Sequence, residues 1–184
     1  MFKKKLIRRK YLHKRQKKYY NIDKKFFNPL IKILKKNFLA KKLKIALYYP
    51  ALFELDVLKI LDVEYFQKST LLLPILEDKK IMNFYKWKEN EILHVNNFGI
   101  LEPEKSKKIF PNLILVPLIA FDNNKSRLGY GQGFYDRYLN KLNKIKKNFL
   151  TVGVAFSFQK YHKLPINSDD IKLDLILTEK GIIN

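Results

Sequence analysis

The run from Leu113 to Phe121 limits most strongly what this chain can fold into. It is the longest apolar stretch in the sequence, it is interrupted by Pro117, and its residues are apolar on both alternating faces. A membrane-spanning helix needs about 20 apolar residues, so this run is too short and we expect no membrane association. Strands that are apolar on both faces are typical of the buried centre of a parallel sheet. The sequence therefore predicts a parallel β-sheet with this run in its interior.

The segments around this run alternate between strand-like and helix-like patterns. We expect further strands at 44–49, 69–76, 81–87, 150–156 and 174–178, and helices at 3–19, at 54–61, at 134–142, and from Asp23 (the cap) or Pro29 to residue 38. Strands that alternate with helices indicate an α/β fold. A length of 184 residues, 47% of them hydrophobic, suits one domain with a sizeable core. We therefore predict a single α/β domain over residues 1–184, with a mostly parallel sheet and helices on both faces.

The chain is strongly basic, with 38 Lys and Arg against 17 Asp and Glu and a formal net charge of +21. Such a charge attracts nucleic acids and other polyanions. Lysines are spread over almost the whole chain, and Asn, Ile, Phe and Tyr are also plentiful, which favours a bias in composition over a dedicated nucleic-acid surface. The first twenty residues are the exception, because they hold many cations and no acid. They lack the apolar stretch of a secretory signal, so we expect a cytoplasmic protein.

Cysteine is absent, which excludes disulfides, thiolate metal sites and a cysteine nucleophile. The three histidines, His13, His94 and His162, are far apart in the sequence, and none has the spacing of a metal site. Any metal bound by this chain is therefore expected to have oxygen ligands.

Half of the six glycines lie close together, at Gly129, Gly131 and Gly133, between the apolar run and the predicted helix at 134–142. Glycines at a strand-to-helix junction let the backbone approach an anion, and the helix N-terminus offers free N–H groups. Arg127 adds a cation, and Asp136 places a carboxylate in the first helical turn. A carboxylate beside a bound phosphate requires a divalent cation between them. The alternative is a tight loop in which the acid only interacts favourably with the helix dipole.

Two adjacent segments closely resemble the signature of the 5-formyltetrahydrofolate cyclo-ligase family. They are Val116-Pro-Leu-Ile-Ala-Phe-Asp122 and Arg127-Leu-Gly-Tyr-Gly-Gln-Gly-Phe-Tyr-Asp136. The resemblance extends over the whole chain, through the segments at 4–15, 48–56, 99–103 and 165–175. Departures from the usual family residues occur at Val57, Leu118, Gln132 and Phe134.

This resemblance implies an ATP- and Mg²⁺-dependent enzyme that closes 5-formyltetrahydrofolate to 5,10-methenyltetrahydrofolate. In such enzymes the formyl oxygen is phosphorylated, N10 then attacks the formyl carbon, and ADP and phosphate are released. The implied substrate is a small molecule, including its polyanionic polyglutamylated forms, and we expect a monomer with no nucleic-acid or membrane partner. Two alternatives stay open: a basic nucleic-acid-binding protein on the same fold without catalysis, and an ATP-using enzyme with another small substrate.

The resemblance also implies a set of site residues. Arg127 and Asp136 are the expected catalytic residues, and Asp136 and Asp174 the expected Mg²⁺ ligands. The basic helix at 1–19 is expected to contribute to the nucleotide site, whose residues are Lys4, Arg8, Arg127, Leu128, Gly129, Tyr130, Gly131, Gln132, Gly133, Phe134 and Tyr135. The folate site is expected to consist of Tyr49, Glu54, Tyr130, Gly131, Gln132, Gly133 and Phe134.

Each of the isolated residues also has a simpler explanation. Lys4 and Arg8 lie on one helical face, which is also how a solvated basic face would look. Glu54 has the position of an ordinary helix-start acid, and Asp174, expected within an apolar strand, could form a salt bridge with a lysine.

Overall fold

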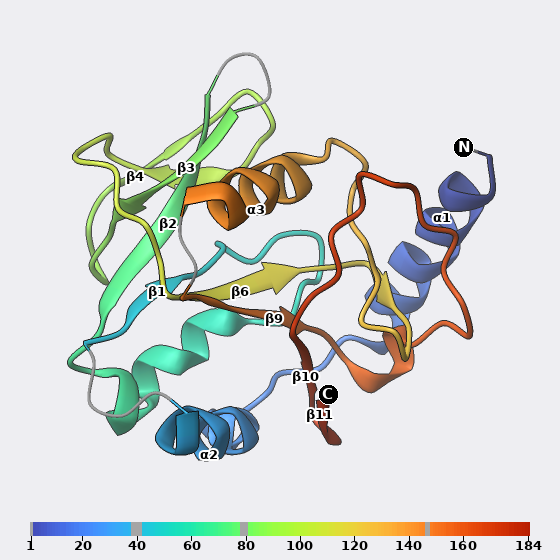
Figure 1. Cartoon of the computed structure of the whole chain (residues 1–184), viewed down its shortest axis with the longest axis horizontal. Helices are drawn as coiled ribbons and strands as arrows, with labels where there is room; N and C mark the ends of the chain where they lie inside the picture. The colour runs from blue at the N-terminus through green and yellow to red at the C-terminus, as the bar shows by residue number, and fades with distance from the viewer. Residues whose placement is uncertain (1, 38–41, 78–80, 146–147) are drawn as a thin grey trace.

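The structure, a computed structural model, describes residues 2–37, 42–77, 81–145 and 148–184, and its main feature is one twisted β-sheet (Figure 1). The described residues form a seven-stranded sheet in the order β11-β10-β9-β6-β1-β2-β3. Its strands are β1 (Lys44–Ala46), β2 (Thr70–Glu77), β3 (Ile81–Lys86), β6 (Leu113–Pro117), β9 (Leu150–Val154), β10 (Leu175–Thr178) and β11 (Gly181–Ile183).

The interior of this sheet is parallel. Neighbouring strands from β10 to β2 all pair in parallel, whereas β3 and β11 join the two edges as antiparallel strands. Strand β6 is fully buried from Leu113 to Val116 and lies between β1 and β9. The predicted parallel sheet with the apolar run in its interior is therefore confirmed.

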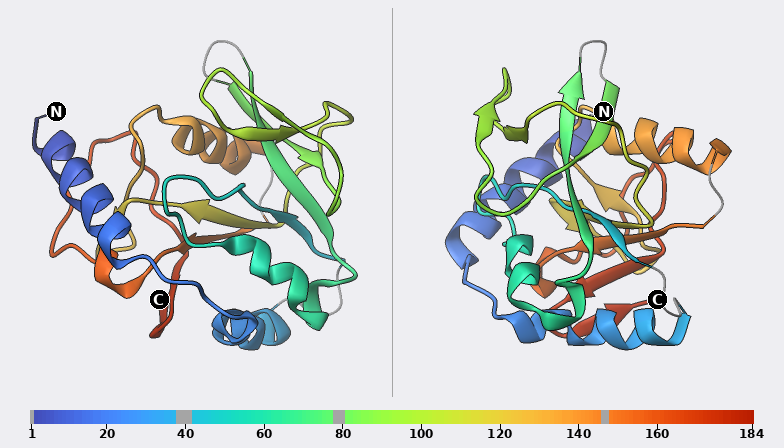
Figure 2. Two further views of the ribbon diagram at one scale, coloured as in Figure 1. Left: turned by 180° about the vertical axis from the view of Figure 1, so that it is seen from behind. Right: turned by 90° about the vertical axis from the view of Figure 1, so that its left-hand side faces the viewer.

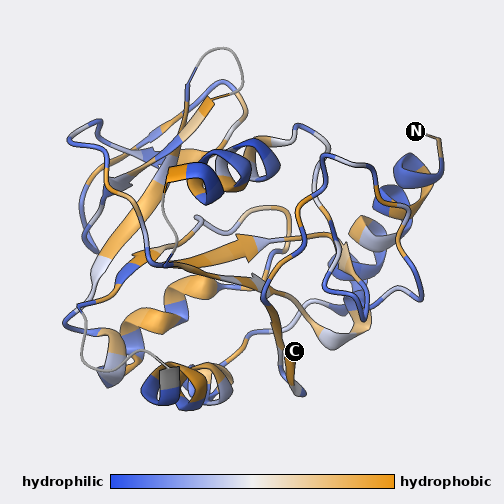
Figure 3. Ribbon diagram, in the orientation of Figure 1, coloured by the Kyte–Doolittle hydropathy of each residue, from blue (hydrophilic) through white to orange (hydrophobic). Residues whose placement is uncertain are grey.

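Helices cover both faces of the sheet, as predicted (Figure 2). On one face lie α2 (Asn28–Asn37) and the 3-10 helices η1 (Lys24–Phe27), η2 (Val57–Asp62) and η3 (Glu64–Phe66), which pack residues such as Leu30 and Ile60 against the strands. On the other face, α3 (Phe134–Ile145) buries Leu139 and Leu142. Figure 3 shows hydrophobic residues along the central strands, whereas the surface helices carry hydrophilic outer faces.

Helix α1 (Phe2–Lys18) lies at the end of the sheet toward which β6 points (Figure 1). There it packs Ile7 and Tyr11 against a two-stranded antiparallel ladder formed by β7 (Ala120–Phe121) and β8 (Arg127–Leu128). Because α1 covers the carboxyl end of β6, the most basic segment of the chain lies beside the loops that leave the sheet. Ligands of open α/β sheets bind at this edge.

The structure corrects the expected strand at Leu113–Phe121. Strand β6 ends at Pro117, and the chain then leaves the sheet, so that Ala120 and Phe121 pair with β8 instead. Between the two strands, the carbonyls of Leu118 and Ile119 accept hydrogen bonds from the side chain of the buried Gln159. A side chain distant in sequence therefore holds the chain where it leaves the sheet, and local hydrophobicity gave no sign of this contact.

Other differences are local. The predicted helix at 54–61 is the 3-10 helix η2, which begins after Asp56 and therefore excludes Glu54. The predicted cap is confirmed at Asp23, whose side chain accepts a hydrogen bond from the Lys25 N–H. Among the elements that were not predicted are strand β11 and the hairpin of β4 (Leu93–Val95) and β5 (Leu101–Pro103). Within the described ranges, no helix is long and apolar enough to cross a membrane.

Gly153 in β9 provides a test of how tightly this sheet is packed. A Cβ atom there would lie 2.7 Å from side-chain carbons of Ile176 and Leu173 and 2.8 Å from one of Leu118. Overpacking a well-filled core costs about 1–3 kcal/mol. We therefore expect Gly153→Ala to lower the free energy of unfolding by that amount, measured by urea denaturation.

Gly129→Ala is the matched control, because beyond its chain neighbours no atom lies within 4 Å of the position that an added Cβ would take. We expect its stability to stay within about 0.5 kcal/mol of the parent. Equal stability of the two variants would contradict the described packing around Gly153.

Candidate functional site

The glycine-rich loop joins β8 to α3 and has a backbone that requires glycine. Gly131 and Gly133 have φ angles of +102° and +69°, in the left-handed region that side chains rarely adopt. A Cβ on Gly131 would lie 3.2 Å from the guanidinium carbon of Arg8. At the N-terminus of α3, the loop therefore presents backbone without side chains toward the guanidinium of Arg8. This arrangement is suited to binding an anion.

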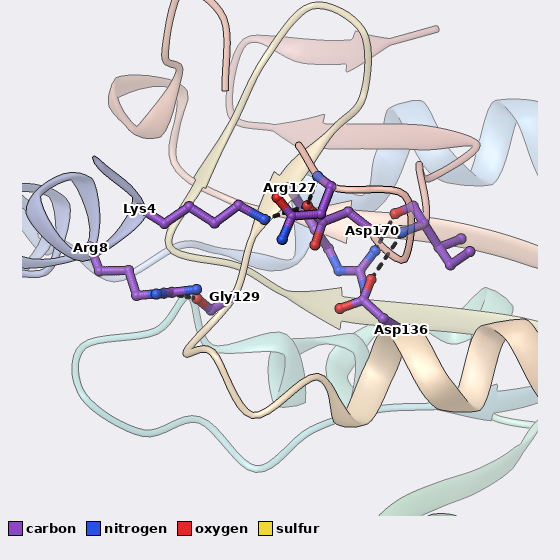
Figure 4. A network of polar contacts seen from close by, with 8 residues as sticks. Lys4, Arg8, Arg127, Gly129, Asp136 and Asp170 are labelled. Carbon is purple, nitrogen blue, oxygen red and sulfur yellow. Dashed lines mark hydrogen bonds and ion pairs between the residues drawn. The ribbon is translucent and has the colours of Figure 1, made fainter. Parts of the chain in front are cut away.

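Two cations of α1 reach this region, as Figure 4 shows. Arg8 Nε donates a hydrogen bond to the carbonyl oxygen of Gly129 at 2.8 Å, and Lys4 forms an ion pair with Asp170. The side chain of Lys4 is only 15% exposed, so it does not belong to a solvated basic face. The structure thus places Arg8 against the loop and Lys4 against Asp170, and the contact of either with a nucleotide stays a prediction.

Arg127 and Asp136 form a partly buried ion pair at the start of α3 (Figure 4). Arg127 Nη2 lies 2.6 Å from Asp136 Oδ1, and the side chain of Arg127 is 4% exposed. The main chain of Ile171 completes the group, because its carbonyl accepts from Arg127 and its N–H donates to Asp136 Oδ1. Burial lowers the pKa of Arg127, and the charge of the Asp136 carboxylate offsets part of that fall. The site therefore holds a desolvated guanidinium fixed in one orientation.

Asp174 lies in a different environment from Asp136. It is exposed and stands just before β10, so the expectation of an acid inside an apolar strand is wrong. Its Oδ2 accepts hydrogen bonds from the Thr151 main-chain N–H at 2.8 Å and from the Thr151 hydroxyl at 2.7 Å. Across the described ranges, no three His, Asp or Glu side chains gather in a way that could hold a metal ion. In the described residues, therefore, Asp136 and Asp174 do not form a metal-binding cluster with a third such side chain.

Asp170 lies beside the site and was not identified from the sequence. It pairs with Lys4 and contributes to the electrostatic environment of Arg127. Burial raises its pKa, but the hydrogen bonds from Lys4 and from the Asn167 N–H outweigh that effect, and the pKa is lowered overall. Its position in a run of polar residues, Asn167 to Asp170, gave no pattern from which a site could be inferred.

Glu54 is buried, with 7% of the residue exposed, and both carboxylate oxygens have protein partners. Oε1 accepts from the Tyr130 hydroxyl at 2.7 Å, and Oε2 accepts from the Ala51 N–H at 3.0 Å. Burial raises the pKa of Glu54, and the hydrogen bonds from Tyr130 and Ala51, with the charge of Arg15, offset part of that rise. A carboxylate held in this way still has lone pairs for two further N–H donors.

Arg15 holds the Tyr130 hydroxyl that bonds to Glu54, and it was not identified from the sequence. It is 1% exposed and donates from Nη2 to the Tyr130 hydroxyl at 2.6 Å and to the Leu52 carbonyl at 2.8 Å. The spacing on α1 offered a signal, because Arg15 lies two helical turns after Arg8 and on the same face.

The predicted Tyr49 lies in a separate groove of about 370 Å³ that also includes Trp87 and Leu93. The indole N–H of Trp87 is buried and has no hydrogen-bond partner among the described residues. Glu54 is not among the lining residues found in the described part of the chain, so Tyr49 and Glu54 are not shown in one pocket.

Some of the remaining predicted site residues are buried in the core and others lie at the surface. Leu128 is buried against α1, Gln132 is exposed, and Phe134 packs edge-to-face on Phe98 with ring centroids 5.9 Å apart. The Tyr135 hydroxyl is buried without a partner in the described structure. Burial and the charge of Glu54 raise its pKa, and Arg127 lowers it in part, so this neutral donor lies near both charged groups.

The chain is also similar to known proteins. Residues 2–179 match the family model of the 5-formyltetrahydrofolate cyclo-ligase family. The 5-formyltetrahydrofolate cyclo-ligase of Haemophilus influenzae is 33% identical over 140 residues, which cover 72% of this chain and 74% of the relative. That of Escherichia coli K12 is 31% identical over 136 residues, covering 70% of this chain and 74% of the relative.

Solved structures show the same fold over almost the full length. The 5,10-methenyltetrahydrofolate synthetase of Aquifex aeolicus is 32% identical, with a TM-score of 0.73 over 97% of this chain and 91% of that one. A 5,10-methenyltetrahydrofolate synthetase from Mycoplasma pneumoniae, 24% identical, shares the fold with a TM-score of 0.70 over 95% of this chain and 97% of that one. The chain therefore belongs to the 5-formyltetrahydrofolate cyclo-ligase family and is a ligase of folate one-carbon metabolism.

Proposed function

We propose that the enzyme uses ATP and Mg²⁺ to cyclise 5-formyltetrahydrofolate to 5,10-methenyltetrahydrofolate at the glycine loop. The observation that carries this proposal is the partly buried Arg127–Asp136 pair, whose two residues flank the glycine loop at the N-terminus of α3. A guanidinium, free N–H groups and a carboxylate are the groups that phosphoryl transfer requires.

The chemical difficulty lies in the formyl oxygen, which belongs to an amide-like carbonyl and is a poor leaving group. Transfer of the γ-phosphoryl group to this oxygen releases ADP and makes the carbon electrophilic. N10 of the same molecule then forms the new C–N bond and loses its proton, the C–O bond breaks, and the oxygen leaves as inorganic phosphate. The attack is intramolecular, so the protein has to hold the substrate and neutralise charge, and it needs no covalent nucleophile.

The cations around the loop supply that neutralisation. Arg127 is preorganised because Asp136 and Ile171 hold its guanidinium, and a fixed donor costs no reorganisation during the reaction. Lys4 and Arg8 reach the same region from α1 and add two further cations to the site. Burial of these side chains strengthens their interaction with phosphate relative to the exposed lysines of the surface.

Asp136 is the carboxylate best suited to hold Mg²⁺. Its Oδ1 is occupied by Arg127 and by the Ile171 N–H, and the side chain is 26% exposed, which leaves Oδ2 as the oxygen for a cation. Magnesium bound there supplies positive charge to the phosphates and commonly needs only one or two protein carboxylates. The carboxylate of Asp174 is engaged by Thr151, so its part in metal binding stays a prediction.

For the folate, Glu54 is the expected acceptor of the amino-pyrimidine edge of the pterin, because a buried carboxylate can receive two parallel N–H donors. The unpartnered Tyr135 hydroxyl offers a donor between Glu54 and Arg127. Polyglutamylated substrate, the monomeric state and the cytoplasmic location stay predictions. A non-catalytic nucleic-acid-binding role is not favoured, since Lys4 and Arg8 are paired inside the site.

The direct test is the growth of methenyl absorbance in the near ultraviolet with 5-formyltetrahydrofolate, Mg²⁺ and ATP. We expect no product when ATP is omitted.

Asp136→Asn should lower kcat by about 100-fold or more, because the carboxylate that holds the cation is lost. Asp169→Asn, at an exposed acid, is the control and should retain parental rates. Parental turnover by Asp136→Asn would contradict the metal assignment, and Asp174→Asn tests the second ligand in the same assay.

Arg127→Ala should weaken ATP more than folate. Loss of a hydrogen-bonded charge contact to phosphate corresponds to a rise in the KM for ATP of about 10-fold or more. Arg9→Ala is the matched control, because Arg9 is an exposed arginine on α1. Steady-state kinetics with each substrate varied separately would distinguish the two effects, and an unchanged KM for ATP would argue against the proposed phosphate contact.

A further inference from the structure

One hydroxyl joins the glycine loop to the carboxylate of Glu54. The Tyr130 hydroxyl donates to Glu54 Oε1 at 2.7 Å and accepts from Arg15 Nη2 at 2.6 Å. Although the Tyr130 residue is 40% exposed, its polar end is therefore fully engaged in the interior. A residue of the proposed phosphate loop thus contacts the acid expected to bind folate.

Arg15 is the fixed point of this connection. Its guanidinium also donates to the carbonyl oxygens of Leu52 and Leu118, at 2.8 and 3.3 Å. Leu52 and Phe53 have left-handed φ angles of 48° and 61°, so Arg15 stabilises the strained turn that leads directly into Glu54. The guanidinium carbon lies 5.7 Å from the centre of the Tyr130 ring, which adds a cation–π contact.

We propose that the Tyr130 hydroxyl, positioned by Arg15, makes the binding of nucleotide and folate mutually favourable. This inference rests on the proposed function, since it assumes that the loop binds nucleotide and that Glu54 binds folate. Tyr130 and Arg15 are positioning residues here, because they act on the reaction through the loop and through Glu54.

The coupling follows from how the loop is held. Arg8 fixes the carbonyl of Gly129, and Arg15 fixes the hydroxyl of Tyr130, so two arginines of one helix hold consecutive loop residues. Gly131 and Gly133 follow directly, and glycine restricts the backbone less than any other residue, so a bound nucleotide would limit the conformational freedom of this segment. A nucleotide bound to this segment also holds Tyr130 in its bond to Glu54, which keeps the carboxylate in one orientation for its own ligand. Less conformational entropy is then lost when the second ligand binds, so that ligand binds more tightly.

Thermodynamic linkage makes this effect reciprocal, so folate must increase the affinity for nucleotide by the same factor. Couplings carried by a few hydrogen bonds are typically about 5- to 150-fold, and a single hydroxyl bridge places the expected factor near the lower end, at about 10-fold.

The test is the dissociation constant of 5-formyltetrahydrofolate, measured by titration calorimetry with and without Mg²⁺ and a non-hydrolysable ATP analogue. For the parent enzyme we expect about 10-fold tighter folate binding when the analogue is present. Tyr130→Phe removes the hydroxyl and keeps the ring, so this ratio should fall to about 1 while both ligands still bind. Tyr65→Phe removes a hydroxyl in η3, in a separate part of the structure, and should keep the parental ratio.

The outcomes separate the two proposals. If both ligands bind the parent enzyme with no change in affinity, or if Tyr130→Phe keeps the parental ratio, the coupling is overturned and the proposed function is untouched. If the parent enzyme binds no folate at all, the proposed function fails and the coupling fails with it. Arg15→Lys gives a second variant that keeps the charge but loses the planar fork, and its ratio should also fall.

The pH dependence of kcat/KM for folate provides a readout that loosened packing would not reproduce. Glu54 is faced by Arg15 from α1, by Tyr48 after β1, by Tyr130 from the loop and by Tyr135 from α3. The Tyr130 hydrogen bond lowers the pKa of Glu54, so its removal raises that pKa. We therefore expect the acid limb of the profile to move to higher pH in Tyr130→Phe, and an unmoved limb would count against the bridge.

Discussion

The guanidinium of Arg15 lies almost completely buried where α1, the turn before Glu54, the end of β6 and the glycine loop meet. A buried cation costs several kcal/mol unless its donors are satisfied. Here the donors of Arg15 bond to main-chain carbonyl oxygens and to the Tyr130 hydroxyl, which is itself bonded to the Glu54 carboxylate. Because those partners come from distant parts of the chain, Arg15 can be satisfied only when the whole site is assembled.

The sheet determines why these segments meet at all. The parallel strands β1, β6 and β9 end at one edge, so the segments that follow them are gathered together. Helix α1 covers this edge without entering the sheet, and its buried face holds Ile7 and Tyr11 together with the site arginines. The same helix therefore contributes to the hydrophobic core and to the candidate site, which explains why so basic a segment is fixed in one orientation.

Much of this arrangement could be predicted from sequence, but only where the information is local. The loop at Gly129 to Gly133, its flanking Arg127 and Asp136, and the helix at α1 are each continuous segments of the chain, and the loop pattern predicted a phosphate-binding junction. The Arg15–Tyr130 and Tyr130–Glu54 contacts span 115 and 76 residues, and no periodicity encodes such pairings. The end of β6 was missed for the same reason, since Gln159 is far from Leu118 in sequence.

The net charge of +21 is a poor guide to this protein's chemistry when it is considered by itself. The site cations differ from the other lysines and arginines because they are buried and bonded to specific partners. Lys4, Arg15 and Arg127 are each largely buried and each bonded to a carboxylate or to the partner of one. In a low-dielectric environment such fixed charges act on a ligand far more strongly than screened surface lysines do. We therefore expect a small number of buried, paired cations to determine which anion is bound, and the surface excess of charge only to raise the local concentration of that anion.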